Sequence, residues 1–157
     1  ENLSADSLII ATGIRRRKLN LENEERFQGK GILSSGKRDA EQVKGKTVCI
    51  IGGGDAALEN ALIMAEFADK VTLIHRRREF RARREFTEKV GRIEKLNILT
   101  ETIVTKITGN YSLESIELQN IKTRQFFNYP TDFLLLRLGV EPNTELFRGK
   151  IELDEYG

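Results

Sequence analysis

The residues best suited to chemistry form a glycine-rich turn, Gly52-Gly53-Gly54, directly after the apolar run Val48-Cys49-Ile50-Ile51. Glycines permit a tight turn and let a pyrophosphate approach the backbone. The helix expected next points its unpaired N–H groups and the positive end of its dipole at that anion. The pattern Gly52-x-Gly54-x-x-Ala57 also keeps a small residue where the helix must pack closely on the strand. The residues predicted to surround a pyrophosphate are therefore Gly52, Gly54, Asp55, Ala56 and Ala57.

Arginines follow the second expected strand, at the point where NAD-binding folds carry an acidic residue. The strand ends at His75 and runs into Arg76, Arg77 and Arg78, with Arg81 close behind. An acid in this place would bind the ribose 2′-hydroxyl of NAD, whereas arginine accepts the 2′-phosphate of NADP. A guanidinium binds phosphate through paired, charge-assisted hydrogen bonds, and a carboxylate would repel it. The cluster therefore favours NADP(H) over NAD(H).

Length and composition describe one globular domain. The chain has 157 residues, 39% hydrophobic and 32% charged, with a formal net charge of +2. No apolar run approaches the length of a membrane span, and no secretion signal is visible, so we expect a cytoplasmic location and no membrane or metal partner. Cys49 is the single cysteine, which excludes a disulfide within these residues. Its position in the middle of a strand favours packing over reactivity.

The elements that must position these residues alternate between strand and helix early and become hairpin-like later. Helices are expected over 56–67 and 83–95, and strands over 7–13, 47–51, 70–75, 97–100, 102–108, 113–119, 123–128 and 133–136. Residues 14–46 show no clear periodicity. The pattern predicts an α/β fold, a Rossmann-like three-layer nucleotide-binding domain with a small parallel sheet. Helices should cover one face of that sheet and an antiparallel β-meander the other.

Taken together, the motifs resemble the NADPH-binding domain of thioredoxin reductase-like flavoproteins, within the pyridine nucleotide-disulfide oxidoreductases. The supporting segments are Leu8 to Gly13, Gly52 to Asp55, His75 to Ala82 and Gly139 to Thr144. The resemblance implies that Arg76, Arg77 and Arg81 bind the 2′-phosphate. It also implies that His75 lies beside the adenine ribose and that Gly139 flanks the nicotinamide side. In such a parent protein, NADPH passes hydride to FAD.

The sequence departs from that family in two respects. Members that reduce thioredoxin carry Cys-x-x-Cys-Asp before the glycine strand, where this chain has Ser35-Gly36-Lys37-Arg38-Asp39, so a dithiol relay is not carried over. Neither half of the FAD-binding domain is present either. We therefore expect 1–14 to be a connecting strand from a missing FAD domain, 15–46 a linker loop, 47–150 the NADP(H)-binding domain and 151–157 the start of the return to the FAD domain.

The leading hypothesis is thus a fragment: the NADP(H)-binding domain of an FAD-dependent oxidoreductase without the dithiol centre. The parent would be an enzyme that could form a homodimer, and the chain alone would be inactive for lack of flavin. The electron acceptor stays open between ferredoxin or flavodoxin, a disulfide reduced directly by flavin, and a quinone-like molecule. Two alternatives are a nucleic-acid-binding module and a degenerate structural domain. The first lacks any known motif, and the second has no reason to keep both the glycines and the arginines.

Overall fold

The computed structural model describes residues 4–155, which divide into two compact units. Among the described residues, the smaller unit comprises 4–17 and 140–155, and the larger one comprises 18–139. In the smaller unit β1 (Ile14–Arg16) pairs antiparallel with β10 (Val140–Pro142), and the 3-10 helix η2 (Glu145–Phe147) follows. Residues 1–3 and 156–157, the outer ends of the expected 1–14 and 151–157 segments, lie outside the described residues.

The strand expected over 7–13 is wrong. No strand occupies these positions in the described part of the chain, and β1 begins only at Ile14. The apolar side chains of Leu8 and Ile9 that suggested a buried strand are 77% and 91% exposed. A strand requires a partner for its backbone groups, and these residues have none among the strands of residues 4–155.

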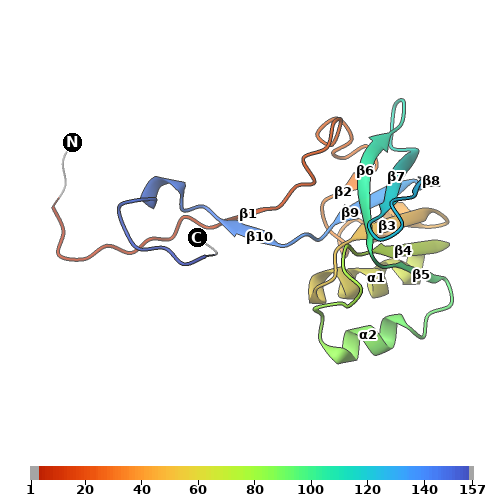
Figure 1. The fold of residues 1–157 in the computed structure, drawn as a ribbon, viewed down its shortest axis with the longest axis horizontal. Coiled ribbons are helices and arrows are strands. Elements are labelled where there is room, and N and C mark those ends of the chain that lie inside the picture. Colours follow the sequence, from red (N-terminus) through yellow and green to blue (C-terminus); the bar gives the residue numbers. More distant parts are fainter. Residues whose placement is uncertain (1–3, 156–157) are drawn as a thin grey trace. The chain divides into compact units, whose positions relative to one another are not determined.

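A five-stranded parallel sheet with the order β2-β9-β3-β4-β5 is the centre of the larger unit (Figure 1). Its strands are β2 (Ile32–Leu33), β3 (Thr47–Ile51), β4 (Lys70–Ile74), β5 (Leu96–Leu99) and β9 (Phe133–Leu136). Four of these strands confirm the sheet predicted from the sequence, within one residue at each end. The fifth, β2, was not predicted.

Two helices cover one face of this sheet. Leu58, Ala61 and Ala65 of α1 (Asp55–Phe67) are buried against it, as the helical spacing predicts. The second helix, α2 (Arg84–Val90), is shorter than the expected 83–95: Gly91 is its C-cap, and turns follow up to β5. Neither helix, nor any other in residues 4–155, is long and apolar enough to cross a membrane.

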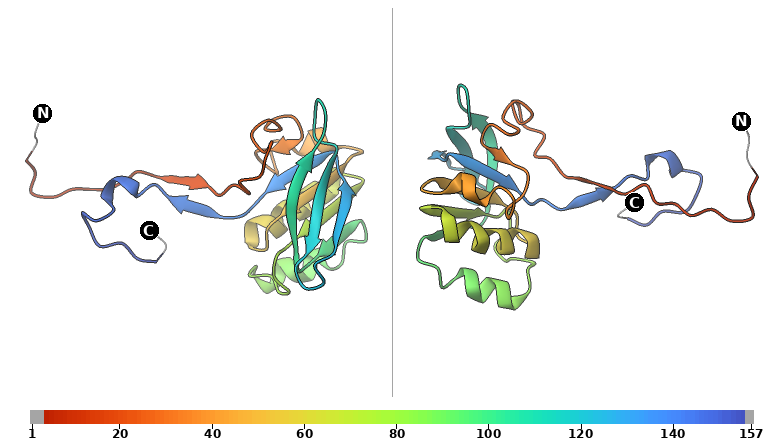
Figure 2. Two further views of the ribbon diagram at one scale, coloured as in Figure 1. Left: turned by 45° about the horizontal axis from the view of Figure 1, so that its top comes forward. Right: turned by 180° about the vertical axis from the view of Figure 1, so that it is seen from behind.

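The antiparallel meander covers the opposite face (Figure 2). It consists of β6 (Thr102–Thr108), β7 (Ser115–Asn120) and β8 (Phe126–Pro130). Strand β3 shows why three layers form: Val48 and Ile50 pack in the core beneath the helices, whereas Cys49 and Ile51 pack in the core beneath the meander. Alternate residues of a strand point to opposite faces, so a fully apolar strand needs cover on both. The predicted three-layer α/β fold is confirmed.

Residues 15–46 are more structured than a linker loop. From Lys18 onward they belong to the larger unit and contain β2 and the 3-10 helix η1 (Ala40–Val43). Phe27 and Val43 are fully buried. These elements are two and four residues long, too short for a periodic pattern to reveal them. Their burial depends on partners far away in the sequence, such as β9.

Candidate functional site

The first two glycines of the turn after β3 are fixed by close neighbours. Gly52 has φ +152°, and a Cβ there would overlap the carbonyl oxygen of Arg137 and lie 2.9 Å from Cβ of Ala57. A Cβ on Gly53 would overlap the imidazole of His75. The Gly52 N–H donates to Ile74 O at 3.0 Å, which joins the turn to the end of β4. The turn therefore requires glycine at positions 52 and 53, because a side chain at either would clash with its neighbours. Ala57 lies against Gly52, which leaves room for only a small side chain at position 57.

Gly54 differs from its two neighbours. It is the N-cap of α1, with extended backbone (φ −100°, ψ 177°), and no heavy atom lies within 4 Å of the place where its Cβ would be. The N–H groups of Asp55 and Ala56, in the first turn of the helix, have no acceptor within the helix. The open space at Gly54 thus adjoins free backbone donors at a positive helix end, a cradle that fits a pyrophosphate.

The side chain of His75 packs against the glycine turn at Gly53. Its side chain is largely buried, its ring stacks on Phe80 with centroids 5.4 Å apart, and Nε2 lies 3.1 Å from the carbonyl oxygen of Glu79. Burial, followed by the positive charges of Arg77 and Arg76, holds the pKa of His75 below its usual value. The imidazole is therefore neutral near pH 7. The position beside the adenine ribose, implied by the resemblance, stays a prediction.

The arginine cluster divides into two groups. Arg83 forms an ion pair with Asp55 at 2.8 Å, and Arg84 pairs with Glu88 at 2.7 Å. Arg76, Arg77, Arg78 and Arg81 are exposed, and no carboxylate within residues 4–155 pairs with them. The second group is thus available to an anionic ligand. This group includes the three arginines that the resemblance assigns to the 2′-phosphate, Arg76, Arg77 and Arg81.

Backbone contacts hold Arg81 against the glycine turn. The carbonyl oxygen of Gly53 accepts the N–H of Arg81 at 2.7 Å and that of Ala82 at 3.2 Å. Arg81 therefore lies beside the glycine turn, although more than twenty residues separate the two in the sequence. Gly139, exposed and with φ +92°, follows two residues after Arg137, whose carbonyl oxygen lies against Gly52.

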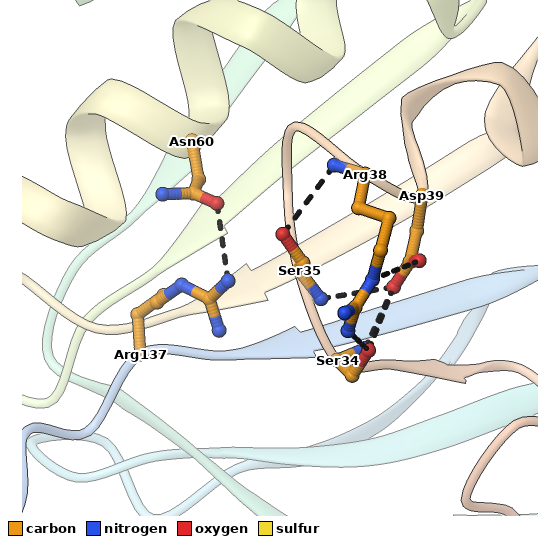
Figure 3. Close-up of polar contacts among 6 residues, drawn as sticks. All are labelled: Ser34, Ser35, Arg38, Asp39, Asn60 and Arg137. Carbon is orange, nitrogen blue, oxygen red and sulfur yellow. Dashed lines mark hydrogen bonds and ion pairs between the residues drawn. The ribbon is translucent and has the colours of Figure 1, made fainter.

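The loop after β2, residues 34–39, is closed by hydrogen bonds (Figure 3). The carboxylate of Asp39 accepts the N–H groups of Ser34 and Ser35, both at 2.9 Å, and Arg38 donates to Oγ of Ser34 at 2.8 Å. Burial alone would raise the pKa of Asp39, but these hydrogen bonds outweigh it and hold the pKa below its usual value. Asp39 therefore stabilises the loop without any cysteine.

Asn60 of α1 is hydrogen-bonded to Arg137, the residue after β9 (Figure 3). Its Oδ1 accepts a hydrogen bond from Arg137 at 3.2 Å, and its Nδ2 donates to Ala56 O at 2.6 Å. A Cβ on Gly36 would overlap the same Oδ1 atom. Sequence reasoning missed Asn60 and Arg137, because nothing in their local pattern separates them from ordinary polar residues of a helix and a strand end.

Cys49 packs in the core, as its sequence position predicts. It is 1% exposed, and burial raises the pKa of its thiol to about 12, so a thiolate does not form near pH 7. Within residues 4–155 no cluster of three or more histidine, cysteine, aspartate or glutamate side chains could hold a metal ion.

Fold and site define a class of protein: a three-layer α/β domain with an open glycine cradle after its first central strand, the architecture of nucleotide-binding sheets. The comparison with protein families gives the same class. All of residues 1–157 match the model described as pyridine nucleotide-disulphide oxidoreductase. The chain belongs to this family.

Thioredoxin reductases are prominent among the similar proteins. The enzyme of Streptomyces coelicolor is 34% identical over 153 residues, which cover 98% of this chain and 48% of the relative. That of Peptoclostridium litorale is 35% identical over 159 residues, covering 98% and 50%. The crystal structure of Lactococcus lactis thioredoxin reductase, at 27% identity, superposes with a TM-score of 0.86 over 92% of this chain and 48% of that one. The chain spans about half the length of the curated relatives it matches.

Proposed function

We propose that this chain is the NADP(H)-binding part of a cytoplasmic, FAD-dependent oxidoreductase similar to thioredoxin reductases. One observation carries the proposal: the exposed guanidinium groups of Arg76, Arg77 and Arg81 lie in a loop hydrogen-bonded to the turn that opens at Gly54. A cradle alone would suit any dinucleotide. The arginines beside that cradle carry positive charges that no carboxylate of residues 4–155 neutralises. They therefore favour a dinucleotide that carries an additional phosphate.

In this proposal each half of the site binds one part of the cofactor. Gly52 and Gly54, with the N–H groups of Asp55, Ala56 and Ala57, surround the pyrophosphate. Arg76, Arg77 and Arg81 bind the 2′-phosphate, and neutral His75 supports both by filling the space beneath Gly53 next to the adenosine half. Gly139 flanks the nicotinamide side. NADPH supplies a hydride, which would pass to FAD held by a domain outside these residues.

The loop at Ser35 and Arg38 provides no electron relay, because neither side chain can form a disulfide. Electrons would therefore leave from the flavin to an acceptor that this chain does not identify. We further propose that residues 1–14 and 151–157 lead to the FAD-binding domain of the same protein. That protein could form a homodimer.

Selective loss of NADPH binding tests the proposal. We would titrate the 157-residue chain with NADPH and with NADH, following nucleotide fluorescence, for the wild type and an Arg76→Ala/Arg77→Ala double variant. Hydrogen bonds to charged groups contribute about 1.5–3 kcal/mol each, so NADPH binding should weaken at least roughly tenfold and NADH binding by less than about twofold. A Lys106→Ala/Lys122→Ala variant, which removes the same charge from exposed positions on the meander, should change neither.

Two results would contradict the proposal. Equal losses for NADPH and NADH would mean that these arginines do not recognise the 2′-phosphate. Unchanged NADPH binding with lost affinity for duplex DNA would instead favour a nucleic-acid-binding module, whose affinity also falls steeply with salt.

A further inference from the structure

The loop that carries the candidate phosphate-binding arginines, residues 76–83, is fastened at its far end to the glycine turn. We call it the arginine loop. Besides the two backbone hydrogen bonds to Gly53 O, the carboxylate of Asp55 accepts two more: Oδ1 from the N–H of Arg83 and Oδ2 from its Nε, both at 2.8 Å. The guanidinium of Arg83 also lies 4.9 Å from the centroid of the Phe86 ring. Backbone and side chain of Arg83 are thus both held.

The near end of the loop is held as well. The N–H of His75 donates to Leu99 O at 2.8 Å, and its ring fills the space beneath Gly53 and stacks on Phe80. With both ends fixed, Arg76, Arg77 and Arg81 start from defined backbone positions. A site prepared in this way loses less conformational freedom when its ligand binds.

Asp55 is an unexpected residue to find beside a pyrophosphate. It is the first residue of α1, so its carboxylate adjoins the proposed cradle, where a negative charge would repel the ligand. The hydrogen bond from the N–H of Arg83, with further contributions from the Arg83 side chain, holds the pKa of Asp55 below its usual value. The carboxylate is therefore charged near pH 7, and its charge is compensated in part by Arg83, whose guanidinium also pairs with Glu85 at 3.2 Å.

We propose that Asp55 is a positioning residue for the 2′-phosphate: by holding Arg83 it fixes the end of the arginine loop and so sets the selectivity for NADPH over NADH. Its carboxylate touches neither phosphate. The inference rests on the proposed function and goes beyond it, because it assigns selectivity to an acidic residue in the pyrophosphate half of the site.

Two explanations of Asp55 predict opposite signs. If its charge acts only through space, replacing it by alanine removes a repulsion and strengthens the binding of NADPH and NADH alike. If it holds the loop, the same change weakens NADPH binding and leaves NADH binding unchanged or stronger. The Asp55–Arg83 pair is largely exposed, with 42% and 65% of the two side chains accessible, and such pairs contribute little to folding. The variants should therefore fold.

The experiment compares Asp55→Ala and Arg83→Ala with Glu88→Gln in the 157-residue chain, measuring the ratio of the NADH and NADPH dissociation constants. Glu88→Gln is the matched control, because it removes the carboxylate that pairs with Arg84 in the adjacent helix. We expect the ratio of the NADH to the NADPH dissociation constant to fall roughly three- to tenfold in Asp55→Ala and Arg83→Ala, the range for lost pre-organisation by a residue without ligand contact. In Glu88→Gln the ratio should stay constant. The Asp55→Ala/Arg83→Ala double variant should be no worse than the poorer single variant.

Amide hydrogen exchange supplies a readout that does not depend on nucleotide. In Asp55→Ala the N–H groups of Arg81 and Ala82 should lose protection, whereas in Glu88→Gln they should keep it. An unchanged ratio, stronger binding of both nucleotides, or unchanged protection would overturn the role of Asp55. A wild type without preference for NADPH would overturn the proposed function, and the role of Asp55 with it.

Discussion

Replacing Gly54 by alanine should separate binding from folding, because Gly54 is the one glycine of the turn with open space around it. Its backbone angles, φ −100° and ψ 177°, suit any residue, and its Cβ would meet no heavy atom within 4 Å. The change should cost less than about 1 kcal/mol of unfolding free energy, the range for alanine at a helix N-cap. The new methyl group would, however, occupy the side from which a pyrophosphate approaches.

Losing one charge-assisted hydrogen bond to the pyrophosphate corresponds to about 1.5–3 kcal/mol, or roughly ten- to a hundredfold in affinity. Since NADPH and NADH share the pyrophosphate, Gly54→Ala should weaken both by the same factor. Gly53→Ala is the informative comparison, because its Cβ would overlap the buried ring of His75. Overpacking of this kind costs about 1–3 kcal/mol, so Gly53→Ala should destabilise the fold.

The assay combines urea unfolding, followed by far-ultraviolet circular dichroism because the chain has no tryptophan, with fluorescence titrations of both nucleotides. Two results would refute the reasoning on Gly54. One is a loss of stability in Gly54→Ala as large as that in Gly53→Ala. The other is weaker binding of NADPH with unchanged binding of NADH.

Three further predictions concern His75, Cys49 and Asp39. Because burial and the nearby arginines lower the pKa of His75, the folded state prefers neutral imidazole: the stabilisation is complete above the unfolded pKa of about 6.5 and is lost as pH falls toward the folded pKa. The urea midpoint should therefore drop between pH 7.5 and 5.5, and His75→Gln, which removes the single histidine, should flatten that slope. Cys49, with its pKa near 12, should react with a thiol reagent only after unfolding, and fast labelling of the native chain would contradict its burial. Asp39→Ala leaves the N–H groups of Ser34 and Ser35 without their acceptor and should cost about 1–3 kcal/mol by urea unfolding, whereas Asp69→Ala, at an exposed position, should cost less than about 0.5 kcal/mol; equal effects would contradict the role of Asp39.

The sequence was sufficient to predict the three layers of the core, because the pattern of apolar residues within each strand and helix determines which of its faces must be buried. Four apolar residues in a row, Val48 to Ile51, cannot leave either face of a strand in water, so they imply cover on both sides. The helical spacing of Leu58, Ala61 and Ala65 likewise places one face of α1 against the sheet. The glycine turn follows from the same strand and helix, since only a tight turn joins them.

What the sequence could not reveal depends on partners distant along the chain. The pairing of Asp55 with Arg83 spans 28 positions, and nothing local distinguishes Arg83 from the other arginines near it. Strand β2 has only two residues and exists because β9 lies beside it. Leu8 and Ile9 caused the opposite error, a strand that was predicted and does not form. These exposed apolar residues are typical of a strand, but no partner strand lies beside them within residues 4–155.

The most direct test of NADP(H) recognition leaves out the nicotinamide, and with it any contribution from a flavin domain. Calorimetric titration of the 157-residue chain should compare adenosine 2′,5′-bisphosphate with adenosine 5′-phosphate, two ligands that differ only in the 2′-phosphate. We expect the bisphosphate to bind at least roughly tenfold more tightly, from charge-assisted hydrogen bonds to Arg76, Arg77 and Arg81, and the advantage to vanish in Arg76→Ala/Arg77→Ala. Equal affinity of the wild type for the two ligands would contradict the assignment of the arginine loop to the 2′-phosphate.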